Sequence, residues 1–158
     1  MPDPTVATCL WFEKDAEKAA EFYVSLFPDS KITSTTPQIG QDGKPVGVLI
    51  VEFELHGQRY QGLNGGPHYK LSPAASISVL VETQDELDHY WDHLLADGGS
   101  EMQCGWLEDR WGLSWQIVPR ALMRLTAQDD RAAAARVVQT MMGMVKIDIA
   151  ALEAASRG

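Results

Sequence analysis

The chain is poor in cysteine, in positive charge and in long apolar runs, and each shortage excludes a class of protein. It has 13 Lys and Arg against 22 Asp and Glu, a net charge of -9, so it lacks the clustered cations that bind nucleic acid or anionic membranes. No apolar run approaches the ~20 residues of a membrane span. Cys9 and Cys104 have no C-x-x-C spacing, which favours reduced thiols over a disulfide framework. We expect a cytoplasmic protein that binds neither nucleic acid nor membrane.

What the sequence does contain is an internal repeat. Its 158 residues, 45% of them apolar, suffice for one domain with a real core, which we place at residues 1–158. Asp15 and Thr83 stand at equivalent positions, 83 − 15 = 68 residues apart. The same offset aligns Thr8 with Ser76. It also aligns two apolar stripes of helical spacing: Ala19, Phe22, Tyr23 and Leu26 with Leu87, Tyr90, Trp91 and Leu94. Two copies of one strand and helix unit are predicted.

Each copy reads as β-α-β-β-β. In the first module, residues 5–66, we predict a strand at 5–12, a helix at 16–27 capped by Asp15, an extended run at 32–37, and strands at 46–55 and 59–63. In the second module, residues 74–119, we predict a strand at 76–81, a helix opened by the capping box T-Q-D-E, and strands at 101–107, 110–113 and 114–118.

Residues 120–158 lie outside the repeat and are predicted to form a helical tail. An Ala-rich amphipathic segment begins near Asp129 and bears Met141 and Met142, and a second helix is capped by Asp148. A Met-rich stripe at helical spacing is typical of packing. We interpret the tail as a lid or a dimer element, and because an apolar face needs cover we expect a homodimer.

Several long motifs resemble one known family. F-Y-x-x-L-F-P-D-S, G-L-N-G-G-P, Y-W-D-x-L, G-W-L-E-D-R-W-G-L-S-W-Q-I-V-P and K-I-D-I-A-A-L-E-A resemble the 3-demethylubiquinone-9 3-methyltransferase-like, PhnB-like branch of the vicinal oxygen chelate superfamily. The resemblance implies an α+β fold of the glyoxalase type. Its tandem βαβββ modules form cup-shaped half-barrel sheets, here followed by the helical tail.

In metal-dependent members, the resemblance implies a divalent ion held by His or Glu on the inner face of four strands. Counting from the helix caps places those positions at Thr8, at Gln61 or Gly62, at Ser76 and at Gln116. Because none carries an imidazole, a carboxylate or a thiolate, we expect neither a metal nor another cofactor.

Strand alternation extends this interpretation to the floor of the cup. If Thr8 and Ser76 face inward, so do Leu10, Ser78, Leu80, Ser114 and Gln116, while Trp11, Ile77, Val79, Trp115 and Ile117 face the helices. The predicted floor is small, polar and uncharged, which suits an apolar or aromatic ligand held by a few hydrogen bonds. A solvated concave face without a ligand is the alternative. The candidate ligand-binding residues are Thr8, Gln61, Asn64, Ser76, Ser78, Ser114 and Gln116.

Two other groups of residues are weaker candidates. His89 and His93 have the i, i+4 spacing of metal ligands, but the apolar stripe of their helix turns both toward solvent. Glu108, Asp109 and Arg110 read as a charged turn. The catalytic residues are unknown.

We therefore predict a metal-independent small-molecule binding protein. The alternative is an enzyme acting on a small organic substrate. Methyl transfer follows from the family label alone, because the glycine cluster at 62–66 leads into a proline rather than a helix and so lacks the pattern of a nucleotide-binding turn.

Overall fold

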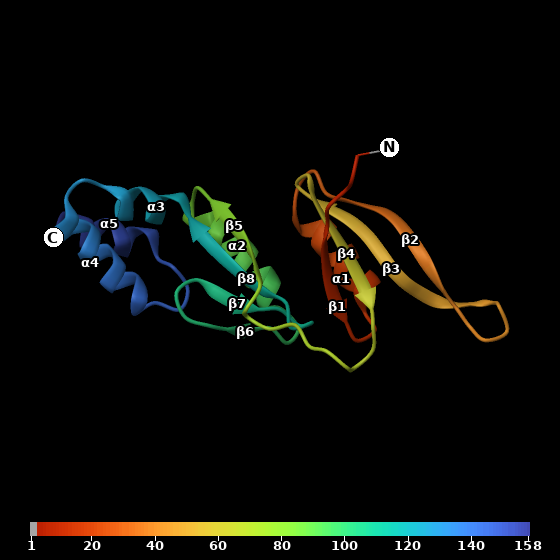
Figure 1. The fold of residues 1–158 in the computed structure, drawn as a ribbon. Helices are drawn as coiled ribbons and strands as arrows, with labels where there is room; N and C mark the ends of the chain where they lie inside the picture. The colour runs from red at the N-terminus through yellow and green to blue at the C-terminus, as the bar shows by residue number, and fades with distance from the viewer. Residues whose placement is uncertain (1–2) are drawn as a thin grey trace. The chain divides into compact units, whose positions relative to one another are not determined.

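The computed structural model describes residues 3–158, which form an α+β fold (Figure 1). The chain divides into two compact units, Met1–Leu71 and Ser72–Gly158. Each contains one βαβββ module, so the predicted repeat is confirmed. In the part of the chain described, no helix combines the length and apolar character needed to cross a bilayer.

The first unit is a four-stranded sheet with one helix on one face. Its elements are β1 (Thr8–Phe12), α1 (Ala16–Leu26), β2 (Lys31–Ile39), β3 (Pro45–Leu55) and β4 (Gln58–Asn64), in the sheet order β1-β4-β3-β2. β1 runs parallel to β4, and the other pairs are antiparallel. Tyr23 of α1 is fully buried near Phe53 of β3, whose ring stacks on Tyr60 at 5.4 Å between centroids. These aromatic contacts form the core between helix and sheet.

Strand β2 is a long, exposed edge of that sheet. Its pairing with β3 shifts register at three places: between Ile32 and Ser34, between Thr36 and Pro37, and between Gln38 and Ile39. Such irregularities bend and twist a strand locally. The outer border of the first sheet is therefore not a regular β-ladder.

The second unit repeats this topology. Its elements are β5 (Ser76–Val81), α2 (Gln84–Leu95), β6 (Ser100–Glu101), β7 (Trp106–Glu108) and β8 (Ser114–Pro119), in the order β5-β8-β7-β6. The predicted capping box is confirmed, because the Thr83 hydroxyl accepts from the Glu86 amide at 3.2 Å and the Glu86 side chain accepts from the Thr83 amide. The predicted stripe is also confirmed, with Leu87, Trp91 and Leu94 at most 1% exposed.

The prediction of a strand at 110–113 was wrong, because these residues form a turn. Asp109 is buried, and its carboxylate accepts the backbone amides of Trp111 at 2.9 Å and Leu113 at 3.1 Å. The same side chain accepts from the indole nitrogen of Trp115 at 2.9 Å. These hydrogen bonds curl residues 110–113 into a turn between β7 and β8. The strand predicted at 101–107 is likewise divided into β6 and β7.

The tail forms three helices, α3 (Arg120–Ala127), α4 (Arg131–Met142) and α5 (Ile149–Arg157). The sequence predicted the last two, and Asp148 caps α5 by accepting from the Ala151 amide. Between α4 and α5, the chain is attached to its own unit by backbone hydrogen bonds from Cys104 to Met144 and from Gly105 to Val145. Three large apolar side chains of the tail remain exposed: Met123, Val138 and Met142.

Candidate functional site

The candidate site of the first unit lies on its open face, the side of the sheet that α1 does not cover. Val51, Phe53 and Gly62 point toward α1; a Cβ added to Gly62 would lie 3.2 Å from that of Ala16. Alternation puts their neighbours on the open face. The strand register aligns these neighbours in two rows, a polar row of Cys9, Gln61 and Glu52 and an apolar row of Trp11, Leu63 and Ile50.

Glu52 is the charged centre of the polar row. Its carboxylate accepts from the Ser34 hydroxyl at 2.6 Å and from the Gln61 amide at 2.9 Å. The hydrogen bond from Ser34, and next that from Gln61, lower the pKa of Glu52. The open face thus presents an ionised carboxylate held in one orientation, so the prediction of an uncharged floor was wrong for this unit.

The orientation predicted for β1 was also wrong. Thr8 pairs with Tyr60 and Leu10 with Gly62 on the side that faces α1, and Leu10 is only 5% exposed. Trp11 is on the open face instead. Three residues connect β1 to α1, whereas two connect β5 to α2. Counting back from the helix caps therefore misplaces the first strand by one residue, and a shift of one residue exchanges the two faces.

Asn64 has structural partners that the sequence did not reveal. Its side-chain oxygen accepts from the Ala16 amide at 2.9 Å, at the start of α1. Its nitrogen donates to the Glu17 carboxylate at 2.6 Å and to the Val48 carbonyl at 2.9 Å. Asp15, the predicted cap, makes no side-chain capping bond. Asn64 thus joins β4 to α1 and β3.

The N-G-G-P segment packs against Trp11. The Trp11 indole donates to the Gly66 carbonyl at 2.9 Å and meets the Tyr69 ring edge-on at 5.0 Å between centroids. A Cβ at Gly65 would lie 2.3 Å from the indole ring. The glycine is needed here because the indole covers its backbone.

The orientation predicted for the second unit is confirmed. Gln116 pairs with Ser78 across β8 and β5, and its amide donates to the Ser76 hydroxyl at 2.8 Å. Trp115 and Ile117 are fully buried on the opposite face. Ser114 is an exception among the candidates: its side chain is fully buried, and its hydroxyl has no hydrogen-bond partner within residues 3–158.

The donors on these faces do not fit the metal that the resemblance implies. Gln61, Ser76 and Gln116 offer amides and hydroxyls, which bind zinc, nickel and iron poorly. Cys9 and Glu52 add two ionisable groups in the first unit, but desolvation raises the pKa of Cys9 and opposes its thiolate form. In the described chain, no three His, Cys, Asp or Glu residues form a group suited to holding a metal.

Comparison with known proteins gives one matching family model and several similar solved structures. The model, described as 3-demethylubiquinone-9 3-methyltransferase, matches residues 4–118. A PhnB protein from Bacillus cereus is 32% identical with a TM-score of 0.65, over 73% of this chain and 99% of that chain. Among curated proteins, none matches.

Two more distant structures show the same fold. A protein from Pseudomonas aeruginosa is 15% identical with a TM-score of 0.60, over 74% of this chain and 98% of its own. The genomically encoded fosfomycin resistance protein FosX from Listeria monocytogenes is 14% identical with a TM-score of 0.51. The match covers 75% of this chain and 94% of FosX. With the family model covering both modules, this chain belongs to the 3-demethylubiquinone-9 3-methyltransferase family, a PhnB-like branch of the vicinal oxygen chelate superfamily.

Proposed function

We propose that this chain is a metal-independent binding protein for a small organic molecule, and that the ligand lies on the open face of the first sheet. One observation carries the proposal: the Glu52 carboxylate is fixed by Ser34 and Gln61 directly beside an apolar row. Binding sites commonly combine apolar surface with a few polar groups held in place. Gln61 remains in the proposed ligand-binding set of this face, and Glu52 joins it. Ser76, Ser78 and Gln116 lie on the second sheet and remain candidates for its own polar face.

The chemistry of the open face favours a cationic or hydrogen-bond-donating aromatic ligand. An ionised carboxylate accepts hydrogen bonds and attracts positive charge. Trp11, Leu63 and Ile50 lie one register row away and supply apolar contact for a ring. The net charge of -9 disfavours an anion.

Binding is better supported than catalysis by the same groups. The pKa of Glu52 is lowered and that of Cys9 is raised. A carboxylate with a lowered pKa is a weak general base, and a thiol with a raised pKa is a weak nucleophile near neutral pH. For both groups, the pKa is therefore shifted in the direction opposite to the one that acid–base or thiol catalysis requires.

Two matched probes test this proposal. Tryptamine and indole-3-acetate share an indole ring and differ in the sign of their charge, and calorimetry or ligand-observed NMR measures their binding. We expect tryptamine to bind and indole-3-acetate not to bind. Glu52→Gln should lower the affinity for tryptamine about tenfold, which corresponds to the loss of one charge-assisted hydrogen bond.

Glu21→Gln is the control, because it removes the same charge from an exposed position of α1. It should leave tryptamine binding unchanged. Equal binding of both probes, or equal effects of the two substitutions, would overturn the assignment of Glu52. Circular dichroism of both variants checks that they are folded.

A further inference from the structure

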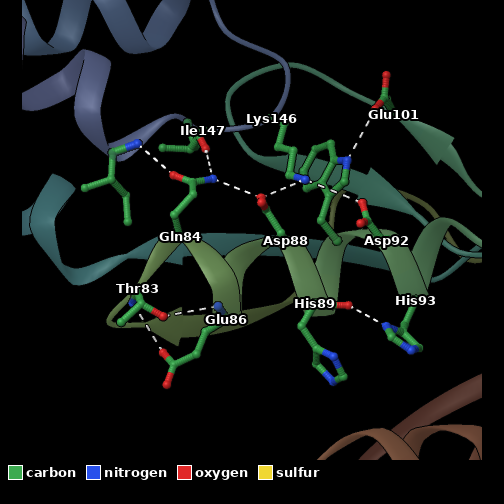
Figure 2. Close-up of polar contacts among 12 residues, drawn as sticks. Thr83, Gln84, Glu86, Asp88, His89, Asp92, His93, Glu101, Lys146 and Ile147 are labelled. Carbon is green, nitrogen blue, oxygen red and sulfur yellow. Dashed lines mark hydrogen bonds and ion pairs between the residues drawn. The ribbon is translucent and has the colours of Figure 1, made fainter.

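The exposed side of α2 carries two histidines one helical turn apart. His89 and His93 both lie on the surface, away from the buried stripe of Leu87, Trp91 and Leu94. Figure 2 shows the two imidazoles side by side, projecting from the same side of the helix. Their ring centroids are 4.4 Å apart. Residues at i and i+4 of a helix are neighbours on its surface, so a single ion can reach both rings.

A hydrogen bond fixes the proton on one of these rings. His93 Nδ1 lies 2.7 Å from the backbone carbonyl of His89. A carbonyl oxygen only accepts, so Nδ1 of the neutral ring carries the hydrogen and Nε2 keeps its lone pair. A backbone carbonyl that holds one ring nitrogen is the usual second partner of a metal-ligating histidine. Among the described residues, no hydrogen bond occupies either ring nitrogen of His89.

Three carboxylates of α2 are already engaged. Asp88 and Asp92 project from the other side of α2, where both pair with Lys146, at 2.7 Å and 3.4 Å (Figure 2). Glu86 accepts from the amides of Glu82 and Thr83 at the start of the helix. The two imidazoles are therefore the nitrogen ligands that this surface can offer, and the exposed Asp85 lies one helical turn before His89.

We propose that His89 and His93 form a two-imidazole surface site for a divalent transition-metal ion, with Cu²⁺ bound most tightly. Imidazole nitrogen suits copper, nickel and zinc, and for a given set of nitrogen ligands copper is the strongest of the three. Metal to imidazole-nitrogen bonds are about 2.0–2.1 Å, so one ion bridges nitrogens up to about 4 Å apart. Water completes the coordination. The site lies on α2, outside the sheet faces proposed for the organic ligand.

Copper titration of the whole chain tests this site, because the sequence offers a matched control. Its four histidines are His56, His68, His89 and His93, so two lie in each unit. Calorimetry should give one Cu²⁺ per chain, and electron paramagnetic resonance should show two coordinated nitrogens. His89→Gln or His93→Gln should each weaken binding at least about tenfold. The double control His56→Gln with His68→Gln should leave it unchanged.

Two results would overturn the proposal. One is unchanged copper affinity after both α2 histidines are replaced, which would place the ion elsewhere, for example at the terminal amine. The other is a loss of affinity in the control. Ni²⁺ provides a second readout: it should bind more weakly than Cu²⁺ and respond to the same two substitutions. The variants change exposed side chains, and circular dichroism verifies that each is folded.

Discussion

Replacing Asn64 with Ala should destabilise the first unit through three lost hydrogen bonds. The cap on the Ala16 amide is worth about 1 kcal/mol, and the two donated bonds contribute roughly 1 kcal/mol each. Because the side chain is only half-buried, we expect a total loss of about 2–3 kcal/mol. For a chain of this length that corresponds to a fall of roughly 5–10 °C in the melting temperature.

Urea unfolding followed by circular dichroism measures this loss, and hydrogen exchange locates it. Protection should fall at the Ala16 amide, whose hydrogen-bond acceptor is removed. A loss below about 0.5 kcal/mol with unchanged protection at Ala16 would refute the role assigned to Asn64. The experiment thus separates a structural asparagine from the ligand-binding one that the sequence predicted.

Asn64→Asp provides a sharper form of the same test. The substitution keeps the acceptor for the Ala16 amide but places a second carboxylate near Glu17, where the Asn64 nitrogen now donates at 2.6 Å. Like charges at that distance repel. Adding Glu17→Gln should recover part of the lost stability, and a double-mutant cycle without coupling would contradict this contact.

Four further predictions concern packing, pH and assembly. Gly65→Ala should lower the free energy of unfolding by about 1–3 kcal/mol in urea denaturation, because the added Cβ would overlap Trp11. Gly143→Ala is the control: its Cβ would meet only a carbonyl oxygen at 3.6 Å, so the free energy of unfolding should be nearly unchanged. Trp91→Ala should cost about 3–5 kcal/mol, as for other buried aromatics, and a loss under about 1 kcal/mol would contradict its place in the core. Hydrogen bonds lower the pKa of Glu52 in the folded chain, so its contribution to stability should be lost as pH falls below its ordinary value of 4.5; denaturation at several pH values should show a shallower acid dependence in Glu52→Gln. Light scattering at micromolar concentration should give the mass of a homodimer, and a monomer mass would leave the apolar side chains of the tail uncovered.

Sequence patterns predicted the order of the elements because that order depends on local signals. The stripes containing Tyr23 and Trp91 are periodic over three turns, and both side chains are buried as expected. The topology of both sheets follows from the family resemblance. By contrast, the face of β1 depended on the length of one connection. The residues between Phe12 and Ala16 carry no signal that distinguishes a connection of three residues from one of two.

Glu52 could have been found from the sequence, whereas the role of Asn64 could not. In V-E-F-E-L, apolar residues alternate with glutamates, and the structure buries Val51, Phe53 and Leu55 while Glu52 stays on the other face. That alternation already indicated a charged open face. Asn64, however, caps a helix that begins 48 residues earlier in the chain. A hydrogen bond of that separation leaves no local pattern.

The irregular edge of the first sheet has a consequence for how copies of this chain meet. A long, exposed strand with free amides and carbonyls invites another strand to add to it and extend the sheet into an aggregate. Strand β2 has three features that disfavour such pairing: three breaks in register, a proline and a lysine at its first position. An approaching strand would find few consecutive amides and carbonyls in line. Strand addition along β2 is therefore disfavoured both as a route to aggregation and as a way of forming a dimer.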